Sequence, residues 1–235
     1  MCKKIVFIHG LLGSKHNFDY LRNEFSEYET ISFDLIGFGG EAKPEIDYTL
    51  EVFLEFVENK LEFERGEEYI LVGHSLGAQI AKELAKKYPS KVKKIFLLGY
   101  PFLDKGEEAK NRKCFGCSYI RGSWWTRILC ETRTLWKILF FPFIFLFKYK
   151  YRKSYIDYFR HTYASAYGTI HNTILKDKKE DLLDMLHKIV IINGDGDRSA
   201  DLEFAKQFKH YVIDSMNHIF FEHEKEVAKI IKDNI

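Results

Sequence analysis

The stretch that most constrains the fold of this sequence is ILVGHSLGAQIAKELAKKY, at residues 70–88. Its first three residues are apolar, as in a buried strand, and this pattern stops at GHSLG, residues 73–77. A helical pattern begins at once, with Leu76, Ile80 and Leu84 on one face. A serine between two glycines at such a junction has an exposed hydroxyl, with the next backbone N–H beside it. The stretch therefore predicts a strand, a sharp turn and a helix that together present a serine for chemistry.

The rest of the sequence repeats this alternation of strands and helices. Short apolar runs predict further strands at residues 5–8, 30–35, 94–98, 188–192 and 211–213. Amphipathic patterns predict helices at residues 14–25, with Ser14 as the cap, at 50–61 and at 222–232. Strands that alternate with helices favour a mostly parallel sheet, here of about six strands, with helices on both faces. The 235 residues suit one such α/β domain.

Residues 101–186 interrupt the alternation, because the strand pattern disappears and the stretch becomes aromatic and mostly helical in character. The sheet needs the strands on both sides of this stretch. We therefore interpret residues 101–186 as a cap or lid inserted into a core made of residues 1–100 and 187–235.

A serine hydroxyl becomes an effective nucleophile when a histidine takes its proton, a carboxylate orients the histidine and donors hold the oxyanion. The sequence offers each of these groups just after a predicted strand. The stretch HGLLG follows the first strand, Asp197 follows the late strand, and His218 follows the last one. Active residues of parallel sheets lie beyond the carboxyl ends of the strands, so we expect these groups to meet Ser75 there.

These motifs resemble the α/β-hydrolase superfamily across nearly the full length of the chain. The matching stretches are HGLLGS (9–14), DLIGFG (34–39), GHSLG (73–77), GDGD (194–197) and NH (217–218). The order of serine, acid and histidine along the chain is the order of that fold. The resemblance implies an α/β-hydrolase fold with a helical cap. It also implies Ser75 as nucleophile, His218 as general base and Asp197 as orienting acid. The N–H groups of Leu11 and Leu76 would form the oxyanion hole.

Other residues near these motifs have alternative interpretations. Asp195 lies in the same turn as the favoured acid, Asp197. Asp104 is a more distant alternative, because some relatives carry the acid after the strand that corresponds to residues 94–98. We expect His9 to brace the oxyanion loop and Asp34 to hold its own turn. His74, beside the nucleophile, is expected to pack structurally and to take no part in the chemistry.

The same residues exclude several classes of function. Related epoxide hydrolases and dehalogenases need a carboxylate nucleophile, and position 75 is a serine. No cofactor or metal is expected, since the pair Cys114 and Cys117 has no second pair and suits ordinary packing in the cap. Four cysteines are too few for a disulfide scaffold at this length, and no secretory signal is visible. We therefore expect a reducing, cytoplasmic compartment.

The cap has an unusual composition. Residues 110–153 carry eleven basic residues and one acid, while the whole chain has a net charge of only +2. All three tryptophans lie there, together with the run ILFFPFIFLF at residues 138–147. This run is shorter than the roughly 20 residues that span a bilayer, and Pro142 is expected to break a helix. It either lines an apolar pocket for an acyl chain or lies on an anionic membrane surface.

The sequence thus predicts a cytoplasmic serine hydrolase, with peripheral membrane attachment as an additional interpretation. Its substrate would be a small-molecule ester or a lipid with a hydrophobic acyl group, cleaved through an acyl-enzyme; nucleic acid is not an expected partner. One alternative is a carbon–carbon bond hydrolase or lyase of the same fold, in which a basic cap residue holds a carboxylate. Another is a membrane-docking protein that is catalytically silent.

Overall fold

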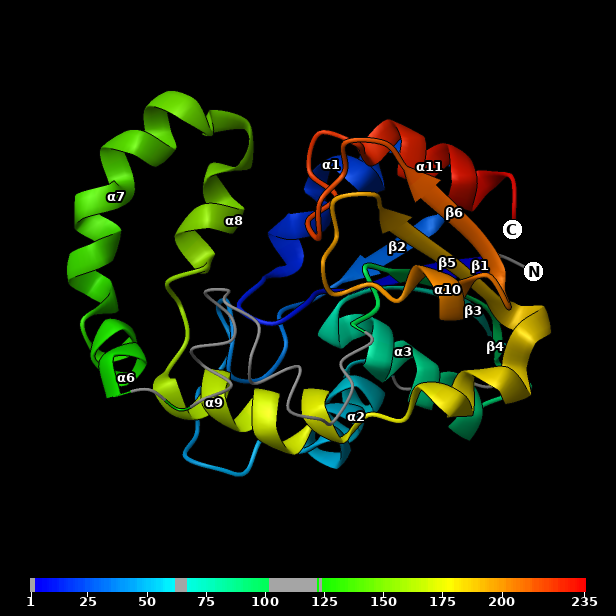
Figure 1. Cartoon of the computed structure of the whole chain (residues 1–235), viewed down its shortest axis with the longest axis horizontal. Helices are drawn as coiled ribbons and strands as arrows, with labels where there is room; N and C mark the ends of the chain where they lie inside the picture. Colours follow the sequence, from blue (N-terminus) through cyan, green and yellow to red (C-terminus); the bar gives the residue numbers. More distant parts are fainter. Residues whose placement is uncertain (1–2, 62–66, 102–121, 123) are drawn as a thin grey trace.

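The centre of the molecule is a six-stranded sheet in which every pair of neighbouring strands is parallel (Figure 1). The computed structural model describes residues 3–61, 67–101, 122 and 124–235. The strand order is β2-β1-β3-β4-β5-β6. The strands are β1 (Lys3–Ile8), β2 (Glu29–Ser32), β3 (Glu68–His74), β4 (Val92–Leu98), β5 (Ile189–Gly194) and β6 (Lys209–Ile213). This sheet confirms the predicted number and direction of strands.

Helices cover both faces of the sheet, because successive side chains of a strand point to opposite faces. Leu71 of β3 packs in one cluster with α2 (Leu50–Leu61) and α3 (Leu76–Lys87). Its neighbour Val72 packs in the opposite cluster with α1 (Asp19–Arg22) and α11 (Glu224–Lys232). The strands between these two layers are continuous apolar runs because both of their faces are buried.

The chain between β4 and β5 contains most of the remaining helices. They are α6 (Trp124–Glu131), α7 (Arg133–Phe147), η3 (Tyr149–Tyr151), α8 (Arg152–Asp157), α9 (Tyr163–Asn172), η4 (Ile174–Lys176) and η5 (Lys179–Lys188). Helix α10 (Leu202–Ala205) lies between β5 and β6. From α9 onward, side chains such as Ile170 and Leu182 join the cluster of α2 and α3. Helices α6, α7 and α8 stand beyond the carboxyl ends of the strands, with α7 outermost (Figure 1).

Two predicted helices have different boundaries in the structure. Ser14 caps its segment as predicted, with its hydroxyl accepting from the N–H of His16 at 3.3 Å. The predicted helix 14–25 is nevertheless divided into η1 (Lys15–Phe18), α1 and η2 (Asn23–Phe25). The Asn17 side chain accepts from the N–H of Ser14 at 3.3 Å and completes a capping box at the start of this segment.

The last helix begins at Glu224 instead of the predicted residue 222. Glu222 has a φ of 75°, outside the helical region, and its N–H donates to the Tyr151 hydroxyl at 2.7 Å. A contact with a distant segment therefore fixes the start of this helix, which a local pattern does not reveal.

The expectation that Pro142 breaks a helix is wrong, because α7 continues through it. Proline removes the hydrogen bond to the carbonyl four residues earlier, that of Ile138. Both residues are exposed, so water can satisfy that carbonyl. Residues 138–143, 145 and 146 are exposed and Ile144 is buried, so the run contributes little to a closed apolar pocket. In the described part of the chain, no helix combines the length and apolar character needed to cross a membrane.

Two leucine-to-alanine variants test this division between core and exposed helix. Leu71 is fully buried in β3, whereas Leu146 of α7 is 73% exposed. We expect Leu71→Ala to lower the free energy of unfolding by about 2–5 kcal/mol. Leu146→Ala should change it by no more than about 0.5 kcal/mol. Urea denaturation of both variants measures these values, and equal losses at the two sites would mean that α7 is covered in solution.

Candidate active site

Ser75 lies in the turn between β3 and α3, in a backbone conformation that is rare for a residue with a side chain. Its φ is 54° and its ψ is −115°, and its N–H donates to the carbonyl of Leu98 at 2.9 Å. A β-carbon at Gly77 would overlap the carbonyl oxygen of Ile8, and one at Gly73 would overlap the backbone of Gly77. Glycine at both positions therefore lets α3 start directly against β1, and this packing holds the strained serine in place.

The two predicted oxyanion donors lie on segments that adjoin Ser75. Leu76 is the first residue of α3, so its N–H has no acceptor within the helix and lies at the positive end of the helix dipole. The loop that carries Leu11 also passes beside the serine, because a β-carbon at Gly10 would be 3.0 Å from the Ser75 β-carbon. Both segments thus lie next to Ser75.

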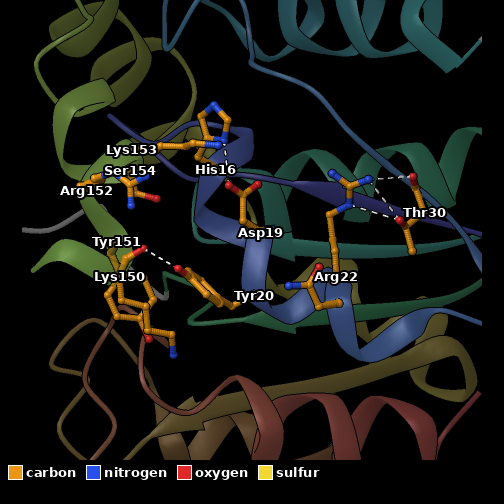
Figure 2. A pocket seen from close by; sticks show the side chains of 11 residues that line it. His16, Asp19, Tyr20, Arg22, Thr30, Lys150, Tyr151, Arg152, Lys153 and Ser154 are labelled. Carbon is orange, nitrogen blue, oxygen red and sulfur yellow. Dashed lines mark hydrogen bonds and ion pairs between the residues drawn. The ribbon is translucent and has the colours of Figure 1, made fainter.

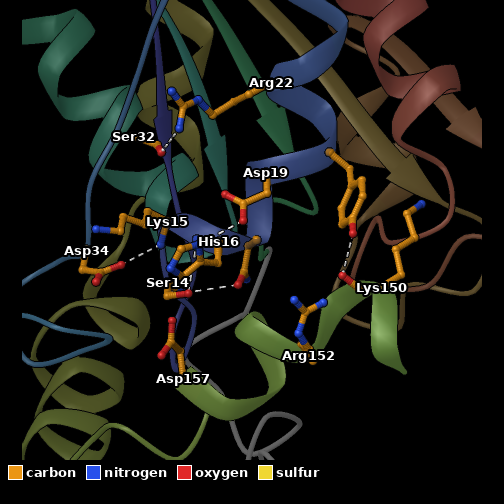
Figure 3. A network of polar contacts seen from close by, with 12 residues as sticks. Ser14, Lys15, His16, Asp19, Arg22, Ser32, Asp34, Lys150, Arg152 and Asp157 are labelled. Atoms are coloured by element: carbon orange, nitrogen blue, oxygen red, sulfur yellow. Dashed lines mark hydrogen bonds and ion pairs between the residues drawn. The ribbon is translucent and has the colours of Figure 1, made fainter. Parts of the chain in front are cut away.

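His9 and Asp34 hold the loop between β1 and η1. The His9 Nδ1–H donates to the carbonyl of Gly10 at 2.8 Å, and Nε2 accepts from the N–H of Leu35 at 2.9 Å. These bonds fit a neutral ring, and burial lowers the pKa of His9 below its ordinary value. The Asp34 carboxylate accepts from the N–H groups of Lys15 at 2.7 Å and Gly40 at 2.8 Å. Figure 3 includes the bond between Asp34 and Lys15.

Asp34 thus joins two loops, where the sequence suggested that it holds only its own turn. Burial favours the neutral carboxyl group and raises its pKa, but the bonds from the Lys15 and Gly40 N–H groups outweigh that effect. The pKa of Asp34 is therefore lowered, and the group is ionised at neutral pH. The charged Asp34 carboxylate therefore fixes the start of η1 relative to the turn after β2.

Asp197 and His218 form the predicted pair of acid and histidine. Asp197 follows β5 and His218 follows β6, and the Nδ1–H of His218 donates to Asp197 Oδ2 at 3.0 Å. Asp197 is 6% exposed, whereas the alternative acid Asp195 is exposed to solvent. The structure therefore pairs the histidine with Asp197.

Ser199 is a member of this cluster that the sequence reasoning missed. Its hydroxyl lies 2.6 Å from Asp197 Oδ1 and 2.9 Å from His218 Nδ1, and its N–H donates to the same carboxylate at 2.9 Å. Burial raises the pKa of Asp197, but the bonds and charge of His218 and the bonds from Ser199 lower it below its ordinary value. The signal in the sequence is the spacing Asp-x-Ser, since a hydroxyl two residues after an aspartate can bond to its carboxylate.

His74 supports the loop that carries His218. Its Nε2–H donates to the carbonyl of His218 at 2.8 Å, and the two rings lie 5.1 Å apart. Burial and the neighbouring charge of His218 lower the pKa of His74 to about 3. The residue is therefore neutral at physiological pH. Sequence reasoning assigned it a packing role, and the structure adds that it anchors the backbone of His218.

The serine and the acid–histidine pair converge on the end of β4. The Ser75 N–H donates to the carbonyl of Leu98. The next residue, Gly99, packs against Asp197 and His218. A β-carbon at Gly99 would lie 3.2 Å from His218 Nδ1 and 3.3 Å from Asp197 Oδ2. The backbone of Ser75 and the pair of Asp197 and His218 thus both adjoin the end of β4.

Three residues considered in the sequence, Asp104, Cys114 and Cys117, lie outside the described residues. Among the residues that the structure does describe, no group of three or more histidine, cysteine, aspartate or glutamate side chains is placed to hold a metal ion.

Comparison with known proteins identifies the fold. A family model described as the alpha/beta hydrolase fold matches residues 3–113. The crystal structure of MGS-M2, an α/β-hydrolase enzyme from a deep-sea metagenome library, is similar with a TM-score of 0.74. It is 19% identical, and the match covers 99% of this chain and 89% of that one. The chain therefore has the α/β-hydrolase fold.

Other proteins that resemble this chain carry functional names of their own. A carboxylesterase structure from Nitrososphaera gargenis has a TM-score of 0.76 at 17% identity, covering 99% of this chain and 89% of that one. A probable lysophospholipase of Arabidopsis thaliana, BODYGUARD 4, is 27% identical over 227 residues. That match covers 83% of this chain and 53% of the plant protein, so the chain spans about half the length of the curated relative.

The depressed pKa of His74 predicts a specific acid sensitivity. The unfolded chain binds a proton at this residue below about pH 6.5, whereas the folded chain binds it only near pH 3. The folded state therefore loses stability as the pH falls between these values, by about 1.4 kcal/mol per pH unit. Removing the imidazole in His74→Gln should make the slope of unfolding free energy between pH 6 and pH 4 shallower by about that amount. Denaturation at several pH values measures both slopes, and identical slopes would contradict a neutral buried His74.

Proposed function

We propose that this chain is a serine hydrolase that cleaves a carboxylic ester, or a related acyl bond, of a hydrophobic substrate. The observation that carries the proposal is the strained Ser75 at the same sheet edge as the His218–Asp197 pair. Maintaining φ at 54° on a non-glycine residue costs about 1–3 kcal/mol, and such strain is concentrated at functional sites. A turn that only connected β3 to α3 would not require it.

The reaction follows from the chemistry of these groups. The Ser75 hydroxyl attacks the ester carbonyl while His218 Nε2 accepts its proton. The N–H groups of Leu11 and Leu76 hold the negative oxygen of the tetrahedral intermediate. His218 then returns the proton to the leaving alcohol, and an acyl-enzyme remains on Ser75. Water activated by His218 releases the acid and restores the serine.

Asp197 supports this cycle as an ionised group that does not itself accept the proton. Its pKa lies below its ordinary value, so it carries a full negative charge when His218 becomes positive. The bond from Nδ1–H also selects the tautomer whose Nε2 is free to act as a base. The Ser199 hydroxyl, bonded to both residues, supports the same orientation.

The substrate class is inferred from the relatives and from the segment between β4 and β5. Similar proteins are named as a probable lysophospholipase and as a carboxylesterase, which both act on esters. Helices α6 to α8 stand beyond the carboxyl ends of the strands, on the side of the molecule where Ser75 lies (Figure 1). We infer that this segment acts as a cap over the site. The lysophospholipase name of the plant protein favours a substrate with a hydrophobic acyl group.

Hydrolysis of p-nitrophenyl esters with acyl chains from two to sixteen carbons tests the proposal. We expect turnover with an optimum at medium or long chains, and Ser75→Ala should lose at least about 10⁴-fold in kcat. Carboxylated diketones serve as comparison substrates for carbon–carbon cleavage. Wild-type protein that leaves every ester intact but cleaves a diketone would contradict ester hydrolysis.

The two aspartates of the turn after β5 provide a matched pair of variants. Asp197→Asn should lower kcat by roughly 10⁴-fold, because the amide no longer holds the correct tautomer of His218. Asp195→Asn, at an exposed position two residues earlier, should retain activity within about twofold. Steady-state kinetics on the best ester compares them, and equal losses would remove Asp197 from its assigned role.

A further inference from the structure

Helix α7 exposes an amount of apolar surface that is unusual for a protein in water. We call the exposed apolar side chains among residues 135–146 the α7 surface. Phe143 is 62% exposed, Leu146 is 73% exposed and Ile138 is 67% exposed. Between Arg133 and the end of the helix, Lys137 is the only charged residue. Large contiguous apolar patches on a protein surface mark sites that bind another surface.

The α7 surface also has the residue types of a membrane interface. Aromatic rings follow one another along the helix and into the next turn, with Trp136 stacked on Phe140 and Phe145 edge-on to Tyr149. Aromatic residues are favoured where hydrocarbon meets the headgroup layer. A helix of 15 residues is about 22 Å long. It can lie parallel to a bilayer with its apolar side chains buried to the depth of the headgroup boundary.

A basic cavity of about 460 Å³ opens directly after α7 in the chain. Figure 2 shows this cavity, with side chains from η1 and α1 on one side and from η3 and α8 on the other. The two sides are joined by the Tyr20 hydroxyl, which donates to the carbonyl of Lys150 at 2.8 Å. The Lys150 ammonium group also lies 4.6 Å from the centre of the Tyr20 ring. The volume lies within the range of about 300–1,000 Å³ that is typical of small-ligand sites.

The charges that line the cavity favour an anion. Four of the lining residues are cations: Arg22, Lys150, Arg152 and Lys153. Lys150 already pairs with Glu224 at 3.2 Å. Asp19 is the one carboxylate of the lining, and it is hydrogen-bonded to His16 at 2.9 Å. Within the described part of the chain, no carboxylate pairs with Arg152 or Lys153. Arg152 instead lies over the Tyr149 ring at 4.2 Å, at the end of the α7 surface. Unpaired cations in a concave site attract phosphate groups.

We propose that the α7 surface and the basic cavity together dock this protein on a membrane that contains anionic phospholipids. The aromatic side chains enter the interface, and a headgroup phosphate occupies the cavity between α1 and α8. The apolar α7 surface matches the hydrocarbon layer of an anionic bilayer, and the basic cavity matches its negatively charged headgroup layer. This inference does not depend on the proposed hydrolase function, since docking requires no turnover.

Sedimentation with vesicles tests the proposal, and Ser75→Ala is used throughout so that no lipid is consumed. Vesicles of phosphatidylcholine with 30% phosphatidylglycerol are compared with vesicles of pure phosphatidylcholine. We expect binding to the anionic vesicles to be at least tenfold stronger and to fall as salt is raised from 0.1 M to 0.5 M, because salt screens the charges. Equal binding to both vesicle types, or none to either, would overturn the proposal.

Two double variants separate the two parts of the docking site. Phe143→Glu with Leu146→Glu should reduce binding to anionic vesicles at least tenfold. Arg152→Glu with Lys153→Glu should do the same, because each basic contact is worth about fivefold in affinity. The control Lys206→Glu with Lys209→Glu makes the same change in charge at the start of β6, an edge strand of the sheet. This control should bind vesicles as strongly as the parent does. All variants should keep the parent melting temperature, because these side chains are exposed or line an open cavity.

Two further measurements identify the competing occupants. If inorganic phosphate at millimolar concentration raises the melting temperature while vesicles are not bound, the cavity serves a soluble anion and membrane docking is wrong. If light scattering finds a dimer that Phe143→Glu with Leu146→Glu converts to a monomer, and vesicles are again not bound, the α7 surface pairs with a second copy. A monomer that binds anionic vesicles through both parts supports the proposal.

Discussion

The contact between the first turn of α3 and the end of β1 determines the geometry of the whole site. At Gly77, a backbone without a side chain packs directly on the carbonyl groups of Ile8 and His9. This approach forces the sharp turn at Ser75 and brings the loop after β1 beside the serine. The other supports then follow. His9 and Asp34 hold that loop, while the end of β4 receives both the serine backbone and the acid–histidine pair.

Much of this arrangement could be predicted because its signals are local. Buried strands between two helical layers appear as apolar runs, and glycines mark the turns that follow them. In a parallel sheet the carboxyl ends of all strands share one edge. A serine after β3, an aspartate after β5 and a histidine after β6 are therefore placed at the same edge of the sheet by topology alone. The turn residue at position 197 could also be preferred over its neighbour at 195 by resemblance to the superfamily.

What the sequence did not reveal depends on contacts between distant segments. The bond from His74 to the carbonyl of His218 joins residues that are far apart in the chain. The start of α11 depends on the Tyr151 hydroxyl, which accepts from the N–H of Glu222, 71 residues further along the chain. The sequence also could not show whether the apolar run in α7 is buried or exposed, because a packed helix and a helix at a membrane interface have similar compositions. Its exposure follows from its position at the outside of the segment between β4 and β5.

The central claim is that Ser75 is a nucleophile activated by His218 and oriented by Asp197. Covalent labelling with a fluorophosphonate, followed by peptide mass spectrometry, tests it most directly because the reagent reacts only with an activated serine. The account predicts one phosphonylated residue, Ser75, and loss of labelling in His218→Gln. Modification of a different serine, or equally fast labelling of His218→Gln, would contradict it.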